Sequence, residues 1–181
     1  MKIGILLAAG LLALPAATRL QDTAKVGAKI PAFSASAVST VDSRATPVPT
    51  AYMIIGVNCG ATPGYEKRFK ALEDEFRSKG VDFVWLFPNK TESKDVKAGW
   101  MKKVGLRGGM VDDEGAKITK SLEIKQTAQI VLCDKDGTIV FRGGIDDNRD
   151  ESAVKARYLA TALQEHLAGK PVTTSSARSF G

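Results

Sequence analysis

The sequence Ala51-Tyr-Met-Ile-Ile-Gly-Val-Asn-Cys-Gly-Ala-Thr-Pro63 joins an apolar run to the start of a helical pattern. The run Ala51–Val57 has the length and apolar character of a buried strand. Proline is frequent at the first position of a helix, so Pro63 indicates that a helix begins there. Cys59 is therefore expected at a strand-to-helix turn. Backbone N–H groups and the helix dipole favour negative charge at such a turn, which makes a thiol more acidic and more nucleophilic.

Cys59 and Thr62 have the spacing of a C-x-x-C redox motif in which threonine replaces the second cysteine. We expect Cys59 to be the catalytic thiolate, which attacks a peroxide to give a sulfenic acid or a disulfide to give a mixed disulfide. Thr62 is expected to donate a hydrogen bond to the thiolate, or else to act as the N-cap of the helix. Gly60 leaves room for a substrate to approach the backbone. The alternative is that Cys59 is a partly buried, inert cysteine.

Hydrophobic patterns divide the rest of the chain into further strands and helices. They predict strands at Ala51–Val57, Val81–Phe87, Gln129–Cys133 and Thr138–Arg142, and helices from Pro63 to the stop at Gly80, from the N-cap Thr91 to about Val104, at Glu114–Leu122 and at about Glu151–Ala168. The early strands alternate with helices, which implies parallel crossovers, and the turn Asp134–Gly137 makes a hairpin of the last two strands. The expected fold is α/β and thioredoxin-like, a three-layer sandwich with a mixed central sheet and helices on both faces.

Several short motifs occur in the order found in one known family. They are Cys59-Gly60 followed by Tyr65, the Asp134–Gly137 turn followed by Phe141–Asp147, and the pairs Tyr158-Leu159, Ala162-Leu163 and Ala168-Gly169. Over roughly Val26–Lys170 the chain resembles the exported thioredoxin-fold redoxins related to alkyl hydroperoxide reductase and thiol-specific antioxidant (AhpC/TSA) proteins. The resemblance implies a thiol-dependent oxidoreductase or antioxidant function.

The chain departs from that family at three places. Thr62 excludes an internal dithiol cycle, so Cys59 is left as a single redox thiol. The family usually has a cis-proline in the loop that faces the redox cysteine and shapes the substrate groove. Here Thr127 is followed by Ala128, and we expect these two substrate-binding residues to be joined by a trans bond, because a non-proline cis bond costs about 3–4 kcal/mol. The peroxidatic motif Pro-x-x-x-Thr-x-x-Cys is also absent, which argues against efficient peroxidase chemistry.

Other chemistry-bearing residues have structural explanations. Cys133 lies inside an apolar strand, so we expect it to pack as a small hydrophobe and to form no disulfide with Cys59. His166, the only histidine, is expected in the last turn of the final helix, where a cation complements the dipole. Arg142 either stabilises the thiolate or, as we prefer, pairs with one of the nearby aspartates Asp146–Asp147. The acidic residues lack regular ligand spacing, so no metal and no cofactor are expected.

Composition changes along the chain suggest its organisation. Lys2, the apolar run Ile3–Leu14 and the small residues after it have the features of a signal peptide; an uncleaved membrane anchor is the alternative. We expect a signal peptide at 1–18, an N-terminal extension and connector at 19–50, the thioredoxin-like domain at 51–169 and a flexible tail at 170–181. No later stretch is apolar for long enough to cross a membrane. The protein is therefore expected to be exported, periplasmic or extracellular.

The charge pattern and the motifs together suggest the class of partner. The 181 residues include 26 Lys and Arg against 20 Asp and Glu, a formal charge of +6, but both signs are interspersed. This pattern indicates a solvated surface rather than a nucleic-acid-binding stripe. Expected partners are an external thiol reductant and a disulfide or peroxide substrate, while the electron donor and the oligomeric state stay open. The sequence predicts an exported thioredoxin-like redox protein with one redox cysteine; the alternative is a non-catalytic thioredoxin-fold binding module.

Overall fold

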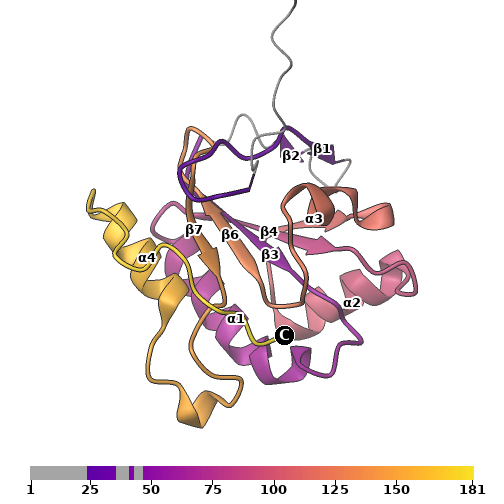
Figure 1. Cartoon of the computed structure of the whole chain (residues 1–181). Helices are drawn as coiled ribbons and strands as arrows, with labels where there is room; N and C mark the ends of the chain where they lie inside the picture. Colours follow the sequence, from indigo (N-terminus) through magenta and orange to yellow (C-terminus); the bar gives the residue numbers. More distant parts are fainter. Residues whose placement is uncertain (1–23, 36–40, 43–46) are drawn as a thin grey trace, which may run out of the picture.

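A mixed five-stranded sheet forms the centre of the protein (Figure 1). The computed structural model describes residues 24–35, 41–42 and 47–181. The strands, in spatial order, are β5 (Gly109–Asp112), β4 (Asp82–Phe87), β3 (Thr50–Ile54), β6 (Ile130–Cys133) and β7 (Ile139–Gly143). The first three are parallel, whereas β6 is antiparallel to both β3 and β7. A separate two-stranded sheet pairs β1 (Ser34–Ala35) with β2 (Val41–Asp42).

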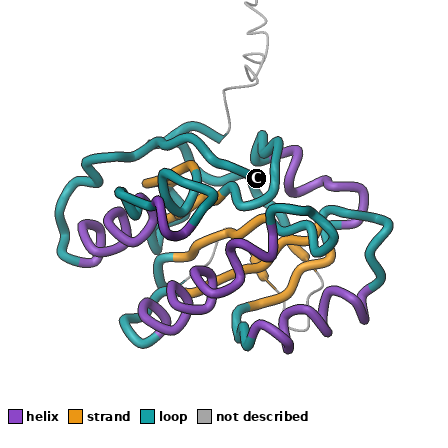
Figure 2. Tube along the Cα trace, turned by 90° about the horizontal axis from the view of Figure 1, so that it is seen from below, coloured by secondary structure: helices purple, strands orange, loops and turns teal. Residues whose placement is uncertain are grey.

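Helices cover both faces of this sheet. The chain crosses from β3 to β4 through α1 (Thr62–Arg77) and from β4 to β5 through α2 (Lys94–Val104). Both crossovers step in the same direction, so their shared right-handedness places both helices on one face. On that face α4 (Tyr158–Leu167) lies beside α1, and Figure 2 looks onto these helices with the strands behind them. The opposite face is covered by the 3-10 helix η1 (Glu114–Ala116), by α3 (Lys117–Ser121) and by the N-terminal segment.

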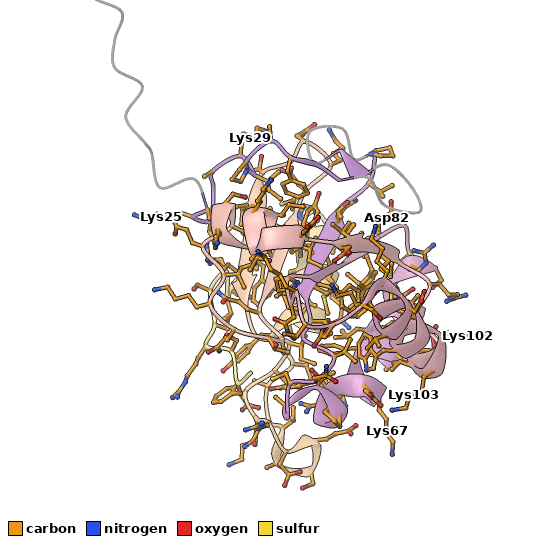
Figure 3. The ribbon with its side chains drawn as sticks, turned by 90° about the vertical axis from the view of Figure 1, so that its right-hand side faces the viewer. Lys25, Lys29, Lys67, Asp82, Lys102 and Lys103 are labelled. Carbon is orange, nitrogen blue, oxygen red and sulfur yellow. The ribbon has the colours of Figure 1, made fainter. Side chains whose placement is uncertain are left out.

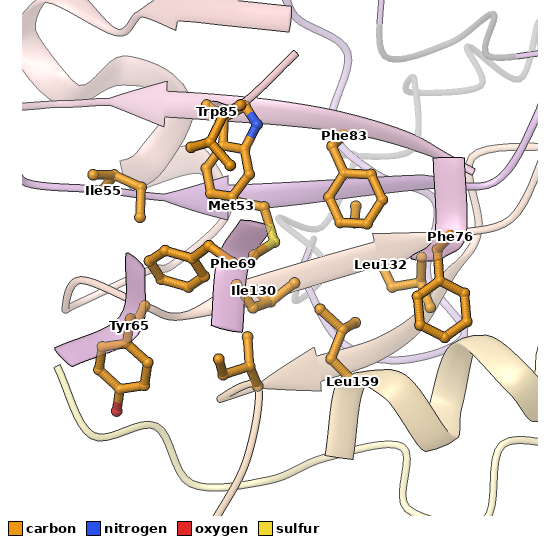
Figure 4. Close-up of a cluster of buried hydrophobic side chains, with 14 of the residues drawn as sticks. Met53, Ile55, Tyr65, Phe69, Phe76, Phe83, Trp85, Ile130, Leu132 and Leu159 are labelled. Carbon is orange, nitrogen blue, oxygen red and sulfur yellow. The ribbon is translucent and has the colours of Figure 1, made fainter. Parts of the chain in front are cut away.

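The strand residues alternate between two hydrophobic cores, as the pleat of a strand requires. Met53 and Trp85 point to the face of α1 and α4, while Tyr52 and Leu86 point to the other face. Figure 4 shows the first core, in which side chains of α1 and α4 converge on the sheet. The predicted α/β thioredoxin-like fold, with a mixed sheet between two helical layers, is confirmed.

Three predicted elements need correction. The expected helix Glu114–Leu122 is divided into η1 and α3, because Gly115 and Ala116 have left-handed φ angles of 77° and 56°. The expected helix Glu151–Ala168 is split into the 3-10 helix η2 (Glu151–Ala153) and α4, with extended backbone between them. Here Asp147 Oδ1 accepts the N–H of Lys155, and the Ala156 carbonyl accepts the N–H of Asp147. These bonds occupy the Lys155 N–H and the Ala156 carbonyl, which in a continuous helix would form backbone hydrogen bonds along the helix. The last correction concerns α2, whose N-cap is Ser93 rather than Thr91, since Ser93 Oγ accepts the N–H of Val96 at 3.3 Å.

The segments outside the expected domain 51–169 also contact the sheet. Gly27 and Ile30 donate N–H groups to carbonyls of Ile139 and Gly137, which binds the N-terminal segment to the last hairpin. Residues 175–177, in the stretch expected to be a flexible tail, hydrogen-bond with β7. The predicted signal peptide 1–18 lies outside the described residues. No helix in the described part of the chain combines the length and apolar composition needed to cross a membrane.

The basic residues of the surface are spread over distant parts of the molecule (Figure 3). Lys25 and Lys29 lie at the end formed by the N-terminal segment, whereas Lys67 and Lys103 project from α1 and α2 near the other end. These labelled lysines do not form one continuous stripe, in keeping with the interspersed charges of the sequence.

Candidate functional site

Cys59 lies in the turn between the end of β3 and the start of α1, where the apolar run and Pro63 predicted it. Its N–H donates to the Gly56 carbonyl at 3.1 Å, and its own carbonyl accepts the N–H of Thr62 at 2.9 Å. These two bonds fix a tight turn at the N-terminal end of a 16-residue helix, whose dipole is positive there. The cysteine is free and partly exposed, so a reagent from solvent can reach this turn.

Thr62 is buried and holds the turn together through its side chain. Its hydroxyl donates to the Gly56 carbonyl at 2.6 Å, which uses the single proton of that group. The N-cap of α1 is Ala61, without a side-chain cap, so the prediction of Thr62 as the N-cap is wrong. The structure also directs the hydroxyl proton to the backbone rather than to the thiol. Thr62 thus determines where Cys59 sits.

The structure brings Gly60 and Thr127 to the same place as Cys59. A Cβ built on Gly56 would lie 3.2 Å from Thr127 Oγ1 and 3.4 Å from Cys59 Cβ, so both side chains border this glycine. Gly60 is exposed, and a Cβ there would meet no atom within 4 Å. The turn is therefore open to solvent on the side of Gly60 and bounded by Thr127 on another.

Ala128 differs from its neighbour, because it is buried and only 1% exposed. Its N–H donates to the Ile54 carbonyl at 2.9 Å, and its φ of +59° is in the left-handed region. No peptide bond among the described residues is cis, so the expected trans bond after Thr127 is confirmed. Ala128 shapes the loop through its backbone, while the substrate-binding role expected of its side chain stays a prediction.

Glu92 is a site residue that the sequence analysis did not identify. Its side chain is 3% exposed, and its Oε1 accepts the N–H of Asn58 at 2.9 Å and the Asn89 amide at 3.1 Å. Its other oxygen, Oε2, is buried without a hydrogen-bond partner. This carboxylate is bonded to the residue directly before Cys59. Its position in the sequence could have indicated this role. Asn89 and Glu92 follow the carboxyl end of a buried parallel strand, where α/β proteins place binding residues.

Cys133 has the packing role that its apolar surroundings predicted. It pairs in register with Thr50 at the start of β3, whereas Cys59 follows the end of that strand. Burial raises the pKa of the Cys133 thiol to about 12. Both cysteines are free, so the expectation of no disulfide between them is confirmed.

The predicted pairing of Arg142 is wrong. Its guanidinium donates to the carbonyls of Leu122 at 2.7 Å and Glu123 at 2.8 Å, and also to the carbonyl of Ala24. Asp146 instead forms an ion pair with Arg68, and burial raises the pKa of this carboxyl. The contact to Arg68 joins residues 78 positions apart, so local proximity in the sequence pointed to the wrong partner.

Comparison with known proteins identifies the family to which the chain belongs. Residues 25–158, most of the chain, match the Redoxin family, and the chain belongs to that family. An uncharacterized conserved protein from Geobacillus kaustophilus is 22% identical, with a TM-score of 0.76 over 86% of this chain and 90% of that one. A hypothetical protein from Sinorhizobium meliloti is 18% identical, with a TM-score of 0.77 over 87% and 92%.

A third similar structure has a described activity. It is a secreted Mycobacterium tuberculosis disulfide oxidoreductase homologous to Escherichia coli DsbE, which is 16% identical to this chain. The match covers 59% of this chain and 79% of that one, with a TM-score of 0.50. At these identities the three structures establish a shared fold. No curated protein matches the sequence.

Proposed function

We propose that this protein is an exported thiol-dependent oxidoreductase in which Cys59 is the single redox thiol. One observation carries the proposal: a free, partly exposed cysteine lies at the positive end of α1, with Gly60 open to solvent and Thr127 beside it. This is the position from which a thiolate reacts with a substrate in solution. The leader-like sequence 1–18 supports export, as does the secreted oxidoreductase among the similar structures.

The reaction we propose is thiol–disulfide exchange. The Cys59 thiolate attacks one sulfur of a substrate disulfide, forms a mixed disulfide with it and releases the other sulfur as a thiolate. An external thiolate then attacks the substrate sulfur of the mixed disulfide, which regenerates Cys59 and leaves the substrate joined to the external thiol. A second external thiol completes the two-electron reduction. Thr62 cannot resolve the mixed disulfide, since a hydroxyl forms no disulfide, and Cys133 is buried at the far end of β3.

Two structural features lie next to Cys59. The N-terminal end of α1 follows it directly, and the Glu92 side chain accepts the N–H of the preceding residue, Asn58. Thr62 stabilises the turn through the bond from its hydroxyl to the Gly56 carbonyl. A peroxide substrate would instead transfer an oxygen to Cys59, giving a sulfenic acid and an alcohol or water. Peroxidase chemistry is the weaker alternative, because the peroxidatic threonine is missing.

The pH dependence of Cys59 alkylation tests the proposal. The rate is followed by mass spectrometry of the Cys59 peptide, with the Cys59→Ser variant as the control for background reaction. A midpoint well below that of a free thiol, about 8.5, together with mixed-disulfide formation from a model disulfide, is the expected result. A midpoint at or above the free value, without mixed disulfide, would support the non-catalytic binding module instead.

A further inference from the structure

The C-terminal segment, residues 175–181, begins with a short stretch, Ser175–Ala177, that pairs with β7, the last strand of the central sheet. Arg142 of β7 donates its N–H to the Ser175 carbonyl at 2.9 Å, and its carbonyl accepts the N–H of Ala177 at 3.0 Å. Ser176 thereby forms a parallel bridge with Arg142. The segment is bound here as an added strand would be, through main-chain groups.

The end of this segment lies against the candidate site. The Gln126 side-chain amide donates to the Ser179 carbonyl at 2.6 Å, and the Tyr65 hydroxyl donates to the Phe180 carbonyl at 2.8 Å. A Cβ built on Gly181 would lie only 1.7 Å from the Thr127 carbonyl oxygen, so the two backbones are in direct contact. Figure 1 shows the C-terminus beside the start of α1 and the start of β6.

Two glycines allow this close approach. A Cβ on Gly143 would lie 2.4 Å from the Ala177 carbonyl oxygen, and one on Gly144 would lie 2.8 Å from that of Arg178. A side chain at either position would therefore push the segment away from the sheet. The pair Gly143-Gly144 lies under the segment, with no room for any other residue.

These contacts describe a groove for an extended polypeptide. The protein binds main-chain atoms of Ser175, Ala177, Ser179 and Phe180, which every polypeptide offers. Two side-chain contacts add to these bonds: the Gln126 amide also donates to Ser179 Oγ at 2.5 Å, and Ala177 packs against the first core. The same groove ends at Thr127, which borders Gly56, whose carbonyl accepts the N–H of Cys59. A peptide bound along it would bring its own residues to the redox thiol.

We propose that the C-terminal segment occupies, as an intramolecular ligand, the groove in which an extended segment of a protein substrate binds beside Cys59. A polypeptide disulfide must then displace residues 175–181 before exchange, whereas a small thiol reagent reaches Cys59 from the side of Gly60. The disulfide chemistry rests on the proposed function; the groove and its occupant do not.

A chain that ends at Thr174 tests the proposal. If the segment is docked about 90% of the time, its removal raises the rate of mixed-disulfide formation with a disulfide-bearing peptide about tenfold. Alkylation by iodoacetamide, a small reagent, should change less than the peptide reaction. The synthetic peptide Thr-Ser-Ser-Ala-Arg-Ser-Phe-Gly should bind the shortened chain in calorimetry and restore the slow peptide reaction.

Proline provides a matched pair of variants in the full chain. Ala177→Pro removes the N–H that donates to Arg142, whereas Thr174→Pro makes the same change at an exposed residue just before the paired stretch. Only Ala177→Pro should speed the peptide reaction, and a synthetic peptide with proline at that position should not bind the shortened chain. Unchanged peptide rates in both shortened and proline variants, with no peptide binding, would overturn the inference. An unreactive Cys59 with intact peptide binding would overturn the proposed function alone.

Discussion

At the scale of single residues, the two cysteines differ in what surrounds them. Cys59 is partly exposed at a helix start, while Cys133 is 1% exposed and surrounded by strand residues of the second core. Burial disfavours the charged form of a thiol, which raises the pKa of Cys133 to about 12 from an ordinary value of 9.0. The sequence distinguished these environments correctly, because an apolar strand and a Pro-led helix are both local patterns.

The raised pKa of Cys133 predicts a specific loss of stability in alkali. Above pH 9.0 the unfolded chain loses this thiol proton while the folded protein keeps it, so the free energy of unfolding falls as pH rises. The slope approaches about 1.4 kcal/mol per pH unit. Cys133→Ala should remove this slope in urea titrations carried out at a series of alkaline pH values. Leu132→Ala, at another buried strand position, should lower stability and keep the slope; equal slopes in all three proteins would contradict the prediction.

Replacing Glu92 by Gln or by Leu, two side chains of similar size, should have different effects. Glu92→Gln keeps an oxygen for the N–H groups of Asn58 and Asn89 and removes the negative charge beside Cys59, so alkylation of Cys59 at neutral pH should be faster. Glu92→Leu leaves both donors without this acceptor and should cost about 1–3 kcal/mol of unfolding free energy. The measurements are alkylation rates and urea unfolding. A Gln variant that reacts no faster than the unmodified protein would exclude an electrostatic effect of Glu92.

At the scale of elements, the start of α2 provides a test between two neighbouring hydroxyl residues. Ser93 caps the helix by accepting the N–H of Val96, whereas Thr91 is exposed and precedes the cap. Ser93→Ala should therefore cost about 1 kcal/mol, and Thr91→Ala should leave stability nearly unchanged. Thermal and urea unfolding of the two variants give the comparison. Similar losses in both would mean that Thr91 shares the capping role.

One strand that the sequence analysis missed is defined by a distant partner. β5 (Gly109–Asp112) is a short edge strand with one glycine and one aspartate, and it is recognisable as a strand only through its pairing with β4. The break before α4 has a similar cause, since Asp147 takes the N–H of Lys155 from eight residues away. Strands and helices with a long apolar repeat, such as β4 and α1, were predicted because the repeat itself determines them.

At the scale of the whole molecule, some parts of the site are set by local sequence and others by contacts between distant segments. Cys59, Gly60 and Thr62 lie in one turn and were found from local sequence. Glu92 and the C-terminal segment reach that turn from 34 and more residues away, and their arrival depends on how β4 and β7 are placed in the sheet. The resemblance to redoxins supplied Thr127 and Ala128, which no local pattern marks.

Arg142 connects segments that are far apart in the sequence. Substituting it should therefore have a large effect on global stability. Its guanidinium donates to carbonyls of Ala24, Leu122 and Glu123, while its main chain pairs with the C-terminal segment. Arg142→Met keeps much of the aliphatic side chain but leaves three carbonyls without their charged donor, so unfolding free energy should fall by about 2–5 kcal/mol. Arg142→Lys should recover only part of this loss, because one ammonium does not reproduce the planar geometry of the guanidinium.

Urea unfolding measures this effect, with Lys135→Met as the control, since Lys135 is exposed in the hairpin turn. Hydrogen exchange adds a readout that locates the loss. In Arg142→Met the amide protons of Gly27 and Ile30, which donate to the hairpin, should exchange faster, because the N-terminal segment has lost its link through Ala24. If Arg142→Met and Lys135→Met unfold at the same urea concentration, Arg142 does not hold the three segments together, and the sheet alone keeps them in place.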